Sequence, residues 1–179
     1  ALSVSRAPDP APSSVEVSRD AAWMAHALEL ARGAEDAGEV PIGAVIVRDD
    51  EVLGEGANRT IRDADPTAHA EVVAIREASS RLGDWRLTDS TLYVTLEPCS
   101  MCAGAIVLAR IPRVVFAADD PKAGMGGSLD NLLQDARLNH RCEVTRGVEA
   151  DSSSEMLKAF FRARRGKGAP ETSGEGQAT

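Results

Sequence analysis

The sequence predicts a single α/β domain in which a mixed five-stranded sheet lies between two layers of helices. Short apolar runs alternate with longer helical patterns, which is typical of strands in a sheet covered on both faces. The first two runs are separated only by Arg48-Asp49-Asp50, which indicates an antiparallel hairpin. The length of 179 residues suits one domain with its own hydrophobic core.

Both ends of the chain differ in composition from its middle. Residues 1–19 are rich in Pro, Ser and Ala, and residues 166–179 are a similar stretch rich in Gly. Neither stretch shows a hydrophobic period, so neither can bury enough apolar surface to offset the entropy of ordering. We therefore expect a disordered leader over 1–19, a folded domain over 20–165 and a disordered tail over 166–179.

The elements of this domain are expected in the order αββαβαβαβα. Asp20 can cap the first helix, and Gly38 can end it. The other elements follow from apolar patterns and from the residues that break them. They are strands at 42–47 and 51–57, a helix at 68–82 capped by Thr67, a strand at 91–96, a helix at 99–109, a strand at 113–117, a short helix near 129–136, a strand from 143 and a helix at 152–165.

The composition argues against several classes of protein. No apolar run approaches the roughly 20 residues that a membrane span needs, and no secretory signal pattern is present, so a cytoplasmic protein is the default expectation. Three cysteines, two of them in a C-x-x-C pair, argue against a disulfide scaffold. The net charge of −8 counts against nucleic-acid binding by the chain as a whole, although a local basic patch can still bind phosphates.

Two short motifs carry the chemistry. His69-Ala70-Glu71 and Pro98-Cys99-Ser100-Met101-Cys102 each lie at the start of a predicted helix. Helix N-termini direct free N–H groups into a site and favour the thiolate that metal ligation needs. One histidine and two cysteines supply three zinc ligands, which leaves the fourth position of a catalytic zinc for water. The sequence therefore predicts that His69, Cys99 and Cys102 bind Zn²⁺.

Glu71 is the candidate general acid and base. It lies two residues from His69 and can reach the open position of the metal without ligating it. The combined H-x-E and P-C-x-x-C pattern is the known signature of zinc deaminases, in which the glutamate moves the protons. Either motif alone is weak evidence, because C-x-x-C pairs also occur in redox and structural zinc sites.

At these residues the chain resembles the bacterial tRNA-specific adenosine deaminases of the cytidine deaminase-like superfamily. The resemblance covers about residues 20–165 and neither end. It implies a homodimer with one Zn²⁺ per subunit that hydrolyses adenosine to inosine at the wobble position (34) of a tRNA-Arg anticodon, using zinc-activated water. The matching stretches are EVPIGAV (39–45), DPTAHAE (65–71), LYVTLEPC (92–99), MCAGA (101–105), GSL (127–129), NHR (139–141) and FFRARR (160–165).

The resemblance also implies roles for individual residues in binding the anticodon stem-loop. Asn58 would bind the flipped nucleotide, the Ala70 N–H would read the base edge, and Asn139 would line the pocket. The remaining RNA contacts would come from the loop after the fourth strand and from the last helix. They are Asp120, Lys122, Phe161, Arg164 and Arg165.

Simpler interpretations of several of these residues stay open. Asn58 and Asp120 occupy positions where a turn residue is also expected, and the basic last helix is by itself usually a solvated face. One alternative function is a deaminase of a free base or nucleoside, of the guanine or cytosine type, with the same zinc site. Another is a non-catalytic RNA-binding module in which Cys142 completes a structural zinc site.

Overall fold

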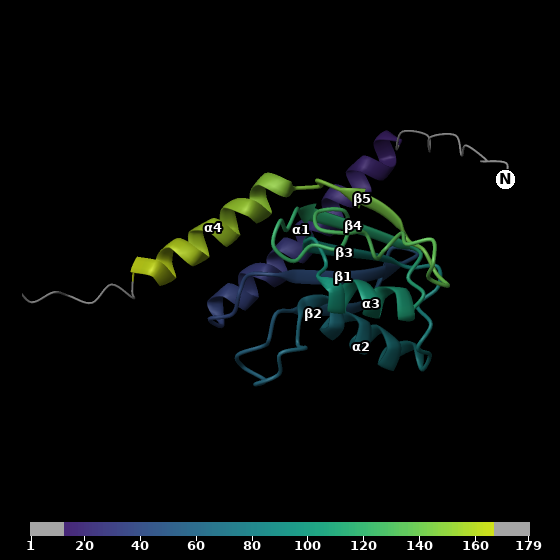
Figure 1. The fold of residues 1–179 in the computed structure, drawn as a ribbon, viewed down its shortest axis with the longest axis horizontal. Coiled ribbons are helices and arrows are strands. Elements are labelled where there is room, and N and C mark those ends of the chain that lie inside the picture. Colours follow the sequence, from purple (N-terminus) through teal and green to yellow (C-terminus); the bar gives the residue numbers. More distant parts are fainter. Residues whose placement is uncertain (1–12, 167–179) are drawn as a thin grey trace, which may run out of the picture.

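The computed structural model describes residues 13–166, which form a three-layer α/β/α sandwich around a mixed five-stranded sheet (Figure 1), as the sequence predicts. None of the described helices has the length and apolar character that crossing a membrane requires. In chain order the elements are α1 (Ser14–Asp36), β1 (Gly43–Arg48), β2 (Glu51–Ala57), α2 (Ala70–Leu82), β3 (Thr91–Leu96), α3 (Ser100–Leu108), β4 (Arg113–Ala118), β5 (Glu143–Arg146) and α4 (Ala150–Gly166).

The sheet has the strand order β2-β1-β3-β4-β5. The predicted hairpin is confirmed: β1 and β2 are antiparallel, and Asp49 and Asp50 adopt the positive φ angles that tight hairpin turns require. Strand β1 is also antiparallel to β3, whereas β3, β4 and β5 are mutually parallel. The ends of β2, β3 and β4 and the start of β1 therefore share one edge of the sheet, which we call the carboxyl edge.

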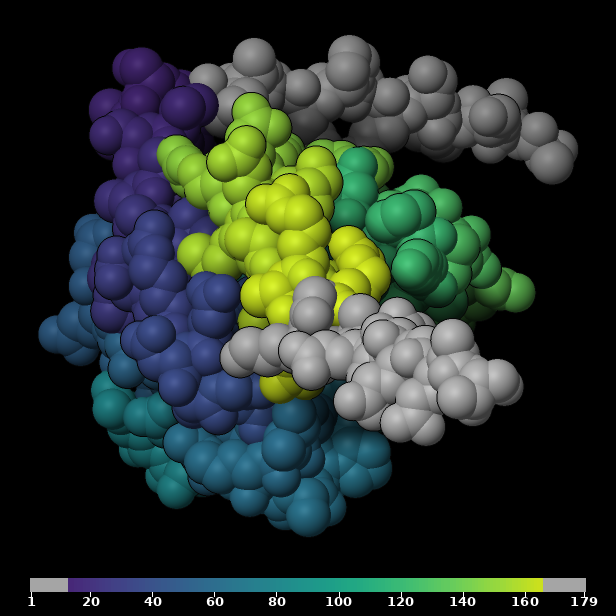
Figure 2. Space-filling view, turned by 90° about the vertical axis from the view of Figure 1, so that its left-hand side faces the viewer, coloured from purple at the N-terminus to yellow at the C-terminus, as the bar shows by residue number. Residues whose placement is uncertain are grey.

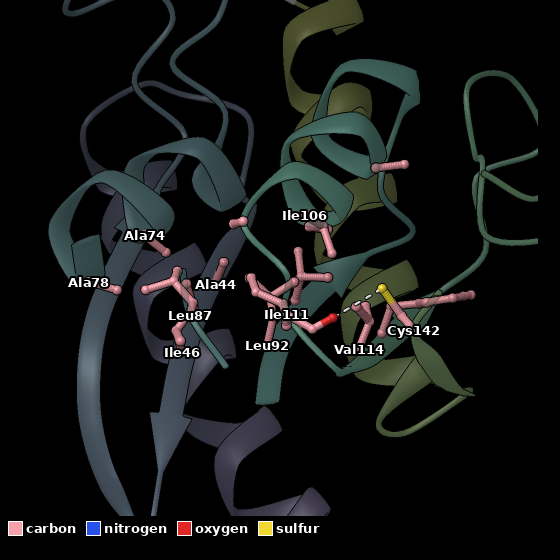
Figure 3. Packing of buried hydrophobic residues seen from close by; sticks show 14 of the residues in the cluster. Ala44, Ile46, Ala74, Ala78, Leu87, Leu92, Ile106, Ile111, Val114 and Cys142 are labelled. Carbon is pink, nitrogen blue, oxygen red and sulfur yellow. Dashed lines mark hydrogen bonds between the residues drawn. The ribbon is translucent and has the colours of Figure 1, made fainter. Parts of the chain in front are cut away.

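Two hydrophobic cores separate the layers. Helices α2 and α3 cover one face of the sheet, and α1 and α4 cover the other (Figure 1). Alternate side chains of β1 enter opposite cores, because successive residues of a strand point to opposite faces. Ala44 and Ile46 pack with Ala74 of α2 (Figure 3), whereas Val45 packs with Met24 of α1.

The contact between β2 and α2 is unusually close because it is made by small residues. A Cβ atom on Gly56 would lie 1.9 Å from the Ala70 carbonyl oxygen, and one on Gly54 would lie 2.4 Å from the Ala74 carbonyl oxygen. Only glycine permits this approach of strand and helix backbones. The N-terminus of α2 is thereby held directly against the end of β2.

The predicted start of the first helix is wrong. Helix α1 begins at Ser14, and Ser13 and Glu16 form a reciprocal capping box, which is the S-x-x-E pattern of this stretch. Residues 14–19 are therefore helical and do not belong to a disordered leader. Asp20 is buried within the helix, where it accepts a hydrogen bond from Tyr93 and pairs with Arg113. The predictions for residues 1–12 and 167–179 lie outside the described residues.

Two further details differ from expectation. The residue that caps α2 is His69, while Thr67 donates both its N–H and its hydroxyl to Asp65. The short helix expected near 129–136 does not form; this segment consists of turns and bends. Asn131 and Asp135 accept hydrogen bonds from backbone N–H groups two or three residues ahead, and such bonds compete with the helical pattern.

Candidate metal centre and active site

The ends of two helices bring the predicted metal ligands together at the carboxyl edge. His69 is the N-cap of α2, and Cys99 is the N-cap of α3. Cys102 lies one turn into α3 and is fully buried. Neither cap residue uses its side chain to cap its own helix, so both side chains remain available for a ligand.

The spacing of these three side chains fits a tetrahedral metal. His69 Nδ1 lies 3.7 Å from Cys99 Sγ and 3.6 Å from Cys102 Sγ, and all three donor atoms lie within 4.8 Å of one another. Zinc bonds of about 2.3 Å to sulfur and about 2.0 Å to nitrogen, at a tetrahedral angle, place the donor atoms about 3.5 Å apart. The set of two sulfurs and one imidazole nitrogen is also typical of zinc.

The local electrostatics favour ligation by Cys99. Hydrogen bonds from the Cys102 thiol, from His69 and, to a lesser extent, from the Cys102 N–H group lower the pKa of Cys99 to about 3, so it is a thiolate at neutral pH. The same contact with Cys99 raises the pKa of His69. The pKa of Cys102 is raised because its thiol donates to the Cys99 sulfur and is buried. A cation that replaces these protons would satisfy both sulfurs at once.

Glu71 has the properties of a proton-transfer group. It is the second residue of α2, only 4% exposed, and lies beside the Cys102 thiol. Burial, and to a lesser extent the nearby Cys99 thiolate, raise its pKa to about 7. A carboxyl group with a pKa near neutrality can both accept and donate a proton at neutral pH, as general acid–base catalysis requires.

Cys142 is remote from this centre. It lies just before β5, at the edge of the sheet where β3 and β4 begin, and its thiol donates a hydrogen bond to the Ile111 carbonyl (Figure 3). Burial raises its pKa to about 11, so it is a protonated, buried thiol. Among the described residues, the only cluster able to hold a metal is His69, Cys99 and Cys102. Cys142 therefore does not supply a fourth ligand.

Asn58 and Ala70 lie beside the metal ligands. Asn58 directly follows β2, is 6% exposed and donates its N–H to the Ile42 carbonyl. The next residue, Arg59, donates its N–H to the Ala68 carbonyl, which ties this segment to the chain before His69. Ala70 is the first residue of α2, where an N–H group has no acceptor within the helix. Both residues are thus held close to His69.

The loop after β4 reaches the same edge. The Asp120 carboxylate accepts hydrogen bonds from the N–H groups of Lys122 and Ala123, so this residue does form a turn. The side chain of Lys122 is exposed. The preceding residue, Asp119, pairs with Arg146 at 2.8 Å. Of the predicted contacts in this loop, only Lys122 therefore presents an uncommitted charge to solvent.

Helix α4 also extends toward this end of the molecule. Figure 2 shows α4 between α1 and the green segment that follows β4. Phe160 is buried, whereas Phe161 is 44% exposed. Arg164 stacks on the Phe160 ring and donates to the Gly38 carbonyl, and Arg165 is exposed. The helix thus presents an aromatic and a basic side chain together.

Asn139 is not brought to the metal centre of its own chain. Its amide oxygen accepts a hydrogen bond from Arg110, which follows the C-terminal end of α3. Cys99 is at the other end of that helix, about 15 Å away at 1.5 Å per residue. Asn139 is exposed at the edge opposite the site.

Comparison with known proteins identifies the family. A family model described as MafB19-like deaminase matches residues 18–165. The tRNA-specific adenosine deaminase of Bacillus subtilis (strain 168) is 50% identical over 151 residues, which cover 84% of this chain and 94% of the relative. The chain belongs to the tRNA-specific adenosine deaminase family. Its relative in Haemophilus influenzae is 51% identical over 147 residues, covering 82% of this chain and 85% of that protein.

Solved structures agree with membership of this deaminase family. A chain from a study of A-to-I editing by tRNA:A34 deaminases superposes with a TM-score of 0.73 at 45% identity, covering 76% of this chain and 99% of that chain. A guanine deaminase from Nitrosomonas europaea superposes with a TM-score of 0.70 at 22% identity, covering 90% and 99%. The second similarity establishes a shared fold.

Sequence reasoning missed two buried glutamates of this deaminase. Glu39 is 1% exposed and accepts hydrogen bonds from the N–H groups of Ile61 and Arg62 in the loop after Asn58. Glu97 is 2% exposed and binds the loop that contains Asp120. For Glu97 the sequence did contain a signal, because this charged residue stands at the end of an apolar strand, directly before Pro98. A carboxylate buried at such a position needs hydrogen-bond donors.

Proposed function

We propose that this protein hydrolyses adenosine to inosine at the wobble position (34) of a tRNA-Arg anticodon. The observation that carries the proposal is the cluster of His69, Cys99 and Cys102 beside the buried Glu71, whose pKa is raised to about 7. Membership of the tRNA-specific adenosine deaminase family supports the choice of substrate.

His69, Cys99 and Cys102 would hold one Zn²⁺ per subunit, and this metal supplies the Lewis acidity that makes water a nucleophile at neutral pH. The His69 Nδ1 atom faces both sulfurs, so its Nε2 carries the proton when the metal is bound. Glu71 takes a proton from the attacking water and delivers it to N1 of the adenine. It then accepts the proton of the new C6 hydroxyl group and passes it to the exocyclic amine, so the C6–N bond breaks, ammonia leaves and the C6 carbonyl of inosine remains.

The base is bound between the end of β2 and the start of α2. Asn58, which is buried beside this junction, holds the flipped nucleotide, and the N–H of Ala70 donates to the base edge. Placing a reacting atom between fixed groups supplies much of the rate acceleration of an enzyme. Burial of Asn58 and Glu71 favours such a fixed arrangement.

The RNA backbone is bound by exposed cations around this edge. Lys122, Arg164 and Arg165 contact the anticodon loop together with the aromatic Phe161, and no carboxylate among the described residues forms an ion pair with any of the three cations. Most other arginines of the described chain pair with a carboxylate. The cations at this edge therefore remain available for phosphates, although the protein as a whole is acidic. Asp120 orders the loop that carries Lys122.

We also propose a homodimer that acts in the cytoplasm, where tRNA is available. Asn139 lies at the edge opposite its own metal centre, so any contact that it makes with the nucleotide serves the site of the other subunit. Sedimentation of the purified protein tests the dimer, and cell fractionation tests the location. A monomer that is fully active at low concentration would refute the shared site.

The direct test is incubation of the zinc-loaded protein with an unmodified tRNA-Arg that contains A34. Inosine should appear at position 34 and nowhere else in the tRNA. The same tRNA with guanosine at position 34 is the matched control. Free guanine, cytosine and adenosine should react far more slowly. Absence of inosine from A34, or faster deamination of a free base, would overturn the assignment of substrate.

The role of Glu71 is tested by Glu71→Ala. This variant should retain zinc and lose at least about a hundredfold in rate, which is the usual contribution of general acid–base catalysis. Glu51→Ala changes an exposed glutamate at the start of β2 and should leave the rate unchanged. A Glu71→Ala enzyme with a near wild-type rate would show that another group moves the protons. Cys99→Ala should lose the metal.

A further inference from the structure

Glu97 connects the metal-ligand segment to the loop after β4. It directly follows β3 and precedes Pro98 and Cys99. One carboxylate oxygen accepts hydrogen bonds from the N–H groups of Gly126 and Ser128, at 2.9 and 3.0 Å. The other accepts the Asp120 N–H at 2.9 Å and the Ser128 hydroxyl. One buried side chain therefore binds both ends of the loop.

The surrounding backbone shares this connection. Met125 donates its N–H to the Pro98 carbonyl at 2.8 Å, and Cys99 forms an isolated bridge with Gly124. A Cβ atom on Gly124 would lie 2.3 Å from the Glu97 carboxyl group, so only glycine fits there. The loop is thus packed against the segment that supplies a metal ligand, with no space between them.

The carboxylate is held by polar N–H and O–H groups alone. Among the described residues, no lysine, arginine or histidine forms an ion pair with Glu97. A buried charge without a counterion is costly unless hydrogen bonds compensate for lost solvation, and here they come from three residues of one loop. An apolar residue would fill the space at less cost but could not fix the conformation of that backbone.

We propose that Glu97 is a positioning residue that makes the site selective for a polynucleotide. It fixes the loop over 119–128 so that Lys122 faces the nucleotides that flank the reacting base. This inference rests on the proposed function. Because Glu97 acts on the loop, its loss should weaken binding of tRNA and leave the chemistry at the bound adenine nearly unchanged.

Glu97→Gln is the principal variant. The amide has almost the same size, but its NH₂ group replaces one acceptor and opposes a donor of the loop. Ser128→Ala is the milder variant, because it removes the hydroxyl and keeps the backbone bond. Glu51→Gln makes the same chemical change at an exposed position at the start of β2 and serves as the control.

Three quantities are measured on zinc-loaded protein: the metal content, kcat and KM for an A34-containing tRNA-Arg, and the rate of tryptic cleavage after Lys122. For Glu97→Gln we expect full metal content, a KM raised about tenfold and a kcat within about threefold of wild type, as for loss of one or two charge-assisted hydrogen bonds. Cleavage after Lys122 should accelerate. Ser128→Ala should raise KM and the cleavage rate by less, and Glu51→Gln should leave both unchanged.

The outcomes separate this inference from the proposed function. If wild-type protein forms no inosine, the proposed function fails. If wild-type protein edits the tRNA and Glu97→Gln edits it with unchanged KM, the inference alone fails. Loss of metal from both Glu97→Gln and Ser128→Ala would also overturn it, because Glu97 would then support the ligand Cys99 and not the loop. A fall in kcat at constant KM would assign Glu97 to the chemistry instead.

Discussion

The substitution Gly56→Ala should disable the site without touching a ligand. Gly56 lies near the end of β2, under the first turn of α2. The added methyl carbon would lie 1.9 Å from the Ala70 carbonyl oxygen and 2.7 Å from the Ala74 nitrogen. Both neighbours are backbone atoms, so no side-chain rotation can relieve the overlap.

The size of the effect follows from these distances. Ordinary contact with a Cβ atom begins at 3.4 Å, so strand and helix must separate by about 1.5 Å. Strand β2 is held by β1, so most of the movement falls on α2. His69 and Glu71 flank Ala70 and must move with it. A misplacement of 1 Å can cost about a hundredfold in rate, and overpacking typically costs about 1–3 kcal/mol of stability.

The assay compares Gly56→Ala with Gly33→Ala. Gly33 lies in α1, and a Cβ atom there would have no neighbour within 4 Å. This control should be as active as wild type and slightly more stable, by about 0.5–1 kcal/mol. For Gly56→Ala we expect a loss of at least about a hundredfold in inosine formation, weaker zinc binding and a lower Tm. Wild-type rate and Tm in Gly56→Ala would refute the claim that this contact positions the site.

Four other perturbations have defined outcomes. Tyr93 is the only tyrosine of the chain, and burial together with the charge of Asp20 raises its pKa to about 12. An absorbance titration should therefore show that its phenolate forms about two pH units higher than in the unfolded protein. Because this pKa is raised in the folded state, the contribution of neutral Tyr93 to the free energy of unfolding is complete below about pH 10 and is lost as pH rises toward 12. Ionisation of the folded protein near pH 10 would contradict this. Cys142→Ala should leave metal content unchanged by elemental analysis, and a metal-free variant would restore Cys142 as a ligand. Arg165→Ala should weaken tRNA binding and lower the slope of log affinity against log salt by about one, and an unchanged slope would exclude a phosphate contact. Chelation of zinc should abolish activity and lower Tm, because the metal binds the folded state, and added zinc should restore both. Equal Tm values for the chelated and the zinc-loaded protein would contradict this.

Much of the fold was predictable because local signals agree with the sheet. The continuous apolar run of β1 and the Asp49-Asp50 turn predict the hairpin, and the breaks at Gly38 and Pro98 predict where neighbouring elements end. The grouping of His69 with Cys99 was also predictable, since each follows a strand or loop and begins a helix. The errors lie where side chains compete with the backbone, as Asn131 and Asp135 do in the segment expected to be helical.

Long-range contacts were harder to predict from the sequence. Glu97 binds backbone N–H groups 23 to 31 residues away, and a backbone N–H leaves no signature in the sequence. The position of Asn139 was predictable in principle. It precedes β5, whereas Asp120 follows β4, and parallel strands begin and end at opposite edges of a sheet. The two residues cannot therefore lie at the same edge of one chain.

The order of strands in the sheet also dictates when the metal centre can assemble during folding. His69 follows β2 and Cys99 follows β3, yet β1 lies between these two strands. The histidine and the thiolates cannot meet until the hairpin has closed and β3 has paired with β1. An unfolded chain offers the metal only the adjacent pair Cys99 and Cys102, so tight binding should develop late and mark chains whose central sheet is complete.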